Sequence, residues 1–234
     1  MNADIIDEHY YRRPEWFLQN ANRYDSFPRN ASKIFGGEYA AQSDKTVSVN
    51  NKNNWQTAIS EAAFMTGLER NADVVVMASY APLFAHVDGW QWTPDLIWVD
   101  NLNAYGTPNY YVQKLFSLNK GTDIIPILAD GKSLAGADSL YASAVLDRKT
   151  NEVVIKLVNA SGKSKIREIN IEGVKKLDTK AMLTVLRSDN MDQVNSIEAP
   201  KAVSPADQTI VLKGKKINVV LAPYSLTVIR VKSL

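Results

Sequence analysis

One glutamate in this sequence follows two glycines at the end of a short apolar segment. Ile34 and Phe35 suit a buried β-strand, and Gly36-Gly37 let the backbone turn or pass close to a ligand. Glu38 comes next, between apolar flanks and with no cation nearby. A carboxylate in this position is suited to act as a nucleophile. From these residues alone, a buried structural acid paired with an arginine fits equally well.

Further ionisable and aromatic side chains follow other apolar segments. Asp7 to Tyr11 follow Ile5-Ile6, Ser79-Tyr80 follow a second segment, and a loop with several tryptophans comes after it. Together these side chains suit a sugar, because aromatic faces stack on C–H surfaces while polar groups bind hydroxyls. A carboxylate nucleophile is usual in the retaining hydrolysis of glycosides. The histidine and tyrosines could instead pack in a core, and loop tryptophans more often anchor a loop than bind sugar.

Composition and motifs argue against several other functions. The formal net charge of +2 gives no case for nucleic acid or an anionic membrane, and the basic residues of 163–180 are interspersed with acids, as on a solvated strand face. No apolar run approaches the ~20 residues of a membrane span. Two histidines, no cysteine and no glycine-rich phosphate loop argue against a metal centre or a nucleotide site, and we expect no cofactor.

The elements that would position these side chains alternate between strand and helix. Helical spacing and proline placement predict helices over 13–22, 55–70 and 107–118, the second of them amphipathic. The apolar run 74–78 predicts a parallel strand buried on both faces, and 80–106 is expected to be a long aromatic loop. Such alternation implies parallel pairing and right-handed crossovers. In a (β/α) barrel, active sites lie at the carboxyl ends of the strands.

The pattern changes after Gly121. Short alternating segments without helices between them, two of which flank a hairpin turn at 148–151, predict an antiparallel β-sandwich. We therefore predict two domains: residues 1–122 as part of a (β/α)8 TIM barrel, α/β in class, and 123–234 as an all-β, jelly-roll-like sandwich. Because the chain begins inside what reads as a strand, we interpret it as the later part of a longer protein.

Motifs in order along the chain carry a resemblance to a known family. They are Asp7-Glu8-His9-Tyr10-Tyr11, Pro14-Glu15-Trp16-Phe17, Gly37-Glu38-Tyr39-Ala40, Ser79-Tyr80-Ala81-Pro82-Leu83-Phe84, Gly106-Thr107-Pro108-Asn109-Tyr110-Tyr111 and Pro223-Tyr224-Ser225-Leu226-Thr227-Val228-Ile229. With these motifs the chain resembles the α-L-arabinofuranosidases of glycoside hydrolase family fifty-one over nearly its whole length. Each motif alone is weak, but their order is specific.

The resemblance implies a retaining mechanism and a set of site residues. Glu38 corresponds to the family's nucleophile and Tyr11 to a tyrosine that hydrogen-bonds the nucleophile. His9 corresponds to a polar residue of the sugar site, and Trp92 is the aromatic residue expected to wall the pocket. The family's acid/base is a glutamate that follows an asparagine at the end of an earlier strand. Here Asn151-Glu152 lies in the predicted hairpin, so the acid/base is expected to be absent from this chain.

The resemblance therefore implies a fragment of an enzyme that removes terminal α-L-arabinofuranosyl residues from polysaccharides or oligosaccharides, and that is inactive alone. Two alternatives stay open: a non-catalytic carbohydrate-binding or scaffold module, and a related clan glycosidase of other sugar specificity. The expected partner is an arabinose-containing glycan, without nucleic acid or membrane. Oligomeric state, including a homo-oligomer, and compartment stay open, with a periplasmic or secreted full-length protein compatible.

Overall fold

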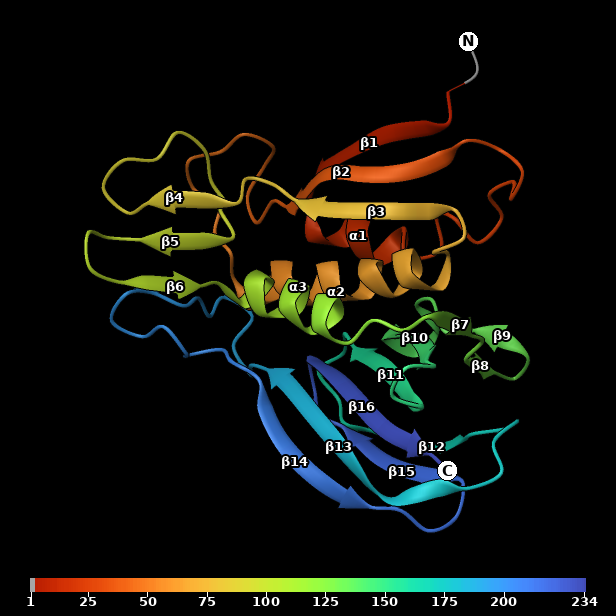
Figure 1. Ribbon diagram of the computed structural model, residues 1–234. Coiled ribbons are helices and arrows are strands. Elements are labelled where there is room, and N and C mark those ends of the chain that lie inside the picture. The colour runs from red at the N-terminus through yellow and green to blue at the C-terminus, as the bar shows by residue number, and fades with distance from the viewer. Residues whose placement is uncertain (1–2) are drawn as a thin grey trace.

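The computed structural model describes residues 3–234, and its N-terminal part is a parallel sheet with helices beside it (Figure 1). The sheet has the order β1-β2-β3 with parallel neighbours, which confirms the predicted parallel pairing. The strands are β1 (Ile5–Arg12), β2 (Lys33–Ala41) and β3 (Val75–Tyr80), and the helices are α1 (Pro14–Gln19), α2 (Trp55–Arg70) and α3 (Pro108–Leu118).

Side-chain caps fix where the two longer helices begin. The Asn54 side chain accepts a hydrogen bond from the backbone N–H of Thr57 at the start of α2. The Thr107 side chain accepts one from the N–H of Tyr110 at the start of α3. Each cap satisfies an N–H that the first turn of a helix leaves without a partner. Both helices therefore begin within a residue of the predicted position.

Two predictions for this part were wrong in extent. The helix predicted over 13–22 ends at Gln19, where the side-chain amide of Asn20 donates to the carbonyl of Trp16 at 2.8 Å and competes with the helical backbone. The segment predicted as a long loop, 80–106, contains a small three-stranded sheet. Its strands are β4 (Phe84–His86), β5 (Ile97–Val99) and β6 (Ala104–Gly106).

The C-terminal part is antiparallel β-structure, which confirms the predicted sandwich. A six-stranded sheet has the order β14-β13-β16-β11-β10-β7, and β12 pairs with β15 in a second sheet. The predicted hairpin at 148–151 joins β10 to β11, which pair in register from Asp147 and Glu152 onward. The strands are β7 (Asp123–Ile125), β8 (Leu128–Ala129), β9 (Lys132–Ser133), β10 (Leu140–Asp147), β11 (Glu152–Asn159), β12 (Lys165–Asn170), β13 (Leu177–Arg187), β14 (Ala206–Val211), β15 (Lys216–Leu221) and β16 (Ser225–Ser233).

Helix α2 lies between the parallel sheet and the sandwich, with α3 beside it (Figure 1). Every residue of α2 from Thr57 to Leu68 is buried. One hydrophobic cluster joins Phe64 of α2 to Tyr39 of β2 and to Leu226 of β16. The prediction of an amphipathic helix was therefore wrong, because a helix packed against two β-layers has no broad solvent-facing side.

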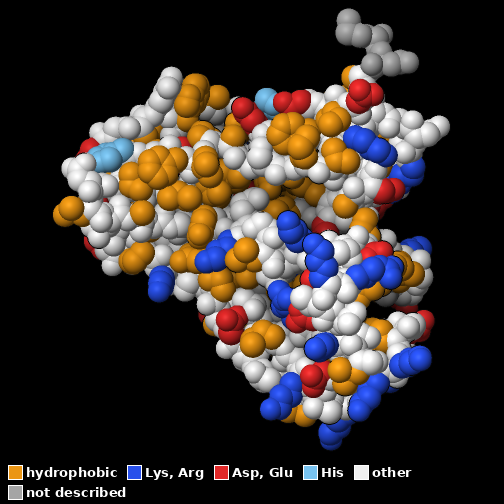
Figure 2. Space-filling view, viewed as in Figure 1, with side chains coloured by type: hydrophobic (Ala, Val, Ile, Leu, Met, Phe, Trp, Pro, Cys, Tyr) orange, Lys and Arg blue, Asp and Glu red, His pale blue; other side chains and the backbone are white. Residues whose placement is uncertain are grey.

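Strand β3 differs from its prediction as well. It was expected to be buried on both faces, yet Val76 and Met77 are 45% and 47% exposed. The reason is that β3 lies at the edge of the sheet. Among the described residues it pairs with one strand, β2, and its other side has no strand beside it. Figure 2 shows hydrophobic side chains gathered on this face of the molecule over β3 and the β4–β6 sheet.

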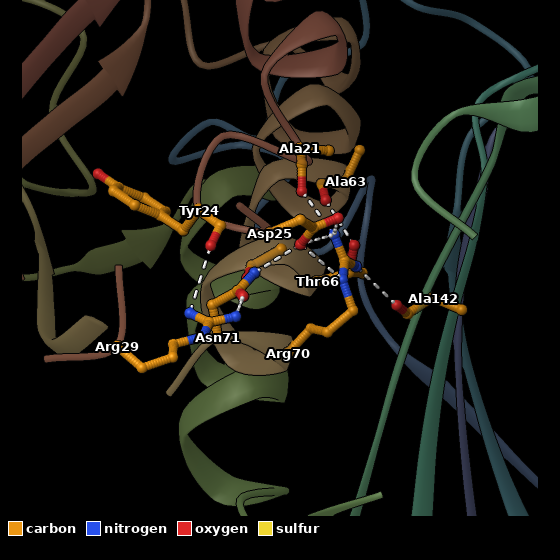
Figure 3. Close-up of polar contacts among 10 residues, drawn as sticks. Ala21, Tyr24, Asp25, Arg29, Ala63, Thr66, Arg70, Asn71 and Ala142 are labelled. Atoms are coloured by element: carbon orange, nitrogen blue, oxygen red, sulfur yellow. Dashed lines mark hydrogen bonds and ion pairs between the residues drawn. The ribbon is translucent and has the colours of Figure 1, made fainter. Parts of the chain in front are cut away.

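The end of α2 is anchored by a cluster of polar contacts drawn in Figure 3. The Arg70 guanidinium pairs with Asp25 at 2.9 Å and donates to the carbonyl of Ala21 at 2.9 Å and to that of Ala142, in β10, at 3.2 Å. Asp25 also accepts from the side-chain amide of Asn71 at 2.7 Å. Arg70 thus connects the segment after α1, helix α2 and the sandwich through one side chain.

We expect Arg70→Ala to lower the free energy of unfolding by about 2–4 kcal/mol, because it leaves two carbonyls without their donor and removes the cation that pairs with a partly buried carboxylate. Chemical unfolding measures the effect. The matched control is Arg148→Ala, which removes an exposed pair with Asp123 and should leave stability nearly unchanged. Equal losses in both variants would contradict the anchoring role of Arg70.

Candidate active site

Glu38 lies on β2 beside two polar side chains of β1. The Tyr11 hydroxyl donates a hydrogen bond to Glu38 Oε2 at 2.8 Å, and His9 Nδ1 lies 3.5 Å from the same oxygen. Strand β2 continues through the two glycines to Ala41, and the pairing with β1 shifts register there. The glycines therefore form a bulge inside the strand rather than a turn at its end, and the bulge re-aims the carboxylate.

Gly37 leaves room for the close approach of Asp7. A Cβ at Gly37 would lie 1.9 Å from Asp7 Oδ1, which is well inside van der Waals contact. Asp7 Oδ2 in turn lies 3.1 Å from His9 Nε2. Because the two ring nitrogens of His9 face Asp7 and Glu38 respectively, the absence of a side chain at Gly37 lets Asp7 orient the imidazole.

Glu8, the other acid of this strand, belongs to a different environment. Successive side chains of a strand point to opposite faces, so Glu8 lies on the face opposite His9 and Tyr11. There it accepts hydrogen bonds from the hydroxyls of Tyr10 and Tyr24, the latter at 2.6 Å, and pairs with Arg23. Glu8 is therefore held as a structural acid.

A cavity of about 450 Å³ opens beside Glu38. Its lining residues are Tyr11, Glu38, Gln42, Thr46, Val47, Ala81, Pro82, Trp92, Thr93 and Pro94. Among these lining residues of the described chain, Glu38 is the one carboxylate. Trp92 is 49% exposed, and its loop is tied down by a hydrogen bond from the Thr93 hydroxyl to the carbonyl of Asn51 at 3.0 Å.

The structure thus brings the predicted site residues together. Glu38, Tyr11 and Trp92 line one cavity, and His9 contacts Glu38 from the side. Burial, and then the hydrogen bond and charge of Glu38, raise the pKa of the Tyr11 phenol above its ordinary value. Tyr11 therefore keeps its proton over the working pH range and acts as a fixed donor to the carboxylate.

Behind the sheet lies an acid whose burial the sequence did not predict. Glu61 of α2 is fully buried, and its Oε1 accepts a hydrogen bond from the N–H of Ala41 at 2.8 Å. Burial raises its pKa to about 8, partly offset by that N–H and by the side-chain amides of Asn109 and Gln113. Oε2 and both amide nitrogens lack strict hydrogen-bond geometry to any described atom. One signal was available: a lone acid inside the run Ala58–Met65, which is otherwise apolar or small.

Within residues 3–234, histidine and acidic side chains do not form a group of three that could hold a metal ion. In the same part of the chain, no helix is long and apolar enough to cross a membrane.

The chain thus belongs to a class of proteins made of two parts. A parallel α/β layer carries a carboxylate–tyrosine pair at a cavity, and an antiparallel sandwich is joined to it. Within that class, the chain belongs to the family described as the alpha-L-arabinofuranosidase C-terminal domain, which it matches over residues 37–225.

Relatives and solved structures agree with this family. The chain is 54% identical over 125 residues to an extracellular exo-alpha-L-arabinofuranosidase of Streptomyces chartreusis, covering 53% of this chain and 14% of the relative. It is 32% identical to alpha-L-arabinofuranosidase 1 of Arabidopsis thaliana, covering 95% of this chain and 32% of that one. The arabinose-bound structure of the MgGH51 α-L-arabinofuranosidase superposes with a TM-score of 0.89 at 35% identity, covering 99% of this chain and 37% of that chain. The chain therefore spans well under half the length of these three proteins.

The raised pKa of Glu61 predicts a pH-dependent stability. A carboxyl whose pKa rises from 4.5 to about 8 on folding stabilises the native state fully below its unfolded pKa, and the contribution is lost as the pH rises through 8. We expect Glu61→Gln to match the wild type near pH 4.5 and to become more stable than it by on the order of a few kcal/mol at pH 8 and above. Thermal unfolding across this range measures the difference, and a difference independent of pH would contradict the prediction.

Proposed function

We propose that this chain is the later part of a retaining α-L-arabinofuranosidase and that Glu38 is its nucleophile. The observation that carries the proposal is the 2.8 Å hydrogen bond from Tyr11 to Glu38 at the wall of the cavity. A phenol that stays protonated holds the carboxylate in one orientation and leaves its second oxygen free to attack.

The reaction is a double displacement. An oxygen of Glu38 attacks the anomeric carbon of a terminal arabinofuranosyl unit, the glycosidic C–O bond breaks, and the leaving oxygen takes a proton from a second carboxylic acid. Water, deprotonated by that second group, then releases arabinose and restores Glu38. His9, oriented by Asp7, binds the sugar or steadies the carboxylate, and Trp92 provides an apolar wall for the sugar ring.

The substrate assignment rests on relatives. The family, the names of both curated relatives and the arabinose in the MgGH51 structure all concern arabinofuranosides. We extend that substrate class to this chain as a terminal α-L-arabinofuranosyl unit on a polysaccharide or oligosaccharide. The MgGH51 likeness supports the extension most, because it combines 35% identity with 99% coverage of this chain.

We further propose that β1, β2 and β3 are three strands of a (β/α)8 barrel, with a boundary to the sandwich near residues 122–123. Strand β7 begins at Asp123 and pairs with β10 of the sandwich, which supports that boundary. The exposed apolar side chains of the parallel layer, including Ile5, Ile6, Val76 and Met77, suit a face that further strands would cover. The required acid/base would lie on such a strand.

The 234-residue chain alone is expected to have negligible glycosidase activity, because the cavity-lining residues supply one carboxylate where a retaining enzyme needs two about 5 Å apart. Hydrolysis of an aryl α-L-arabinofuranoside measures this. Activity of the 234-residue chain that Glu38→Gln abolishes would contradict the proposal that this chain is an inactive part of the enzyme. It would also show that the acid/base is present within these residues.

In the full-length enzyme, Glu38→Gln should reduce kcat by several orders of magnitude, since loss of a nucleophile removes the covalent route. Activity should return in part when Glu38→Gly is given azide, with a glycosyl azide as product. The matched control is Glu15→Gln, an exposed acid of α1 paired with Arg13, which should keep wild-type activity. A Glu38→Gln enzyme with near-normal kcat would refute the assignment.

A further inference from the structure

Glu61 is a buried acid that the proposed reaction does not use. Its side chain lies in the middle of α2 and is 0% exposed. The groups that lower its pKa are the Ala41 N–H and two side-chain amides, with no cation among them. A buried carboxyl without a cation is costly, so a helix position facing a β-sheet would ordinarily hold an apolar residue. The contact that Glu61 makes with β2 is what an apolar residue could not provide.

The N–H of Ala41 needs that contact because the sheet ends beside it. Along a strand, alternate N–H groups point to opposite neighbours, and the N–H of Gln42 donates to Arg12 of β1 at 2.7 Å. The N–H of Ala41 therefore points to the β3 side. There β3 ends at Tyr80, whose register partner on β2 is Tyr39. Glu61 Oε1 occupies the place of the carbonyl that β3 no longer supplies.

A second contact from the helical layer holds the same end of β2. The Tyr39 hydroxyl donates to Gln113 Oε1 of α3 at 2.8 Å. Tyr39 directly follows Glu38, so the residues one and three positions after the carboxylate are both fixed from behind the sheet. Gln42, the next residue, lines the cavity and accepts a hydrogen bond from Asn51 at 2.6 Å.

We propose that Glu61 is a positioning residue: through the N–H of Ala41 it fixes the carboxyl end of β2 so that Glu38 keeps its alignment with Tyr11. The inference rests on the proposed role of Glu38 as nucleophile. Glu61 touches neither the cavity nor a reacting atom, and it acts through the backbone of the strand that carries the carboxylate. Displacement of a reacting group by about 1 Å can cost on the order of 100-fold in rate.

The test compares variants of the full-length enzyme. Glu61→Gln keeps the acceptor oxygen in the neutral form that burial favours, and it should retain kcat within about threefold. Glu61→Met keeps the length without the acceptor, and Glu61→Ala removes both; each should lower kcat about 10- to 100-fold with KM within about twofold. Ser60→Ala is the matched control, because the Ser60 hydroxyl bonds within its own helix to the carbonyl of Thr57. It should leave kcat unchanged.

Hydrogen exchange of the peptide that contains Ala41 gives a readout independent of activity. Exchange should be slow in the wild type, Glu61→Gln and Ser60→Ala, and faster in Glu61→Met at a temperature where all variants are folded. Glu61→Met with wild-type kcat, or with unchanged Ala41 exchange, would overturn the inference. So would a fall in kcat of Glu61→Gln as large as that of Glu61→Met. A wild-type full-length enzyme without glycosidase activity would refute the proposed function instead, and the exchange data would still report whether Glu61 holds β2.

Discussion

The burial of α2 between two β-layers is the constraint on which the rest of the structure depends. A helix with sheets on both sides must place apolar or internally satisfied side chains around its whole circumference. Small residues at Ala58, Ala62 and Ala63 let the layers approach, and Phe64 fills the space toward β2. Gly67 likewise allows close packing around α2, since a Cβ there would lie 2.0 Å from the carbonyl of Ala21.

Polar side chains of α2 also join the layers. Glu69 accepts from Lys156 of β11 at 2.7 Å and from Ser143 of β10 at 2.5 Å. Burial lowers the pKa of Lys156, and the charge of Glu69 opposes that shift. At the other end of the helix, the Trp55 indole donates to the carbonyl of Tyr224 at 2.9 Å. The Lys156–Glu69 ion pair adds little net stability. It disfavours other placements of the sandwich against α2, because either partner alone would be a buried charge.

The side chains of the candidate site could be predicted from the sequence because their motifs are local, but the strand ends were placed too early: β1 runs on to Arg12 and β2 to Ala41. Glu38 and Tyr11 were assigned from their motifs, and the structure brings them to hydrogen-bonding distance. The β4–β6 sheet was missed because each of its strands is three residues long, too short for periodicity to register. The burial of α2 and the exposure of β3 were also missed. Both depend on which layers lie beside an element, which a local pattern does not contain.

The contact between Glu61 and Ala41 could not be predicted from the sequence for a related reason. It exists because β3 stops at Tyr80 while β2 runs on to Ala41, and the offset between two strand ends is a property of the sheet. The residues that line the cavity include one carboxylate, Glu38, with its hydrogen-bond donor Tyr11, so the acid/base of the proposed reaction would come from elsewhere. In the proposed reaction, what these residues control is thus the orientation of Glu38. Groups that control orientation belong behind the strand, where water is excluded and a hydrogen bond is least replaceable.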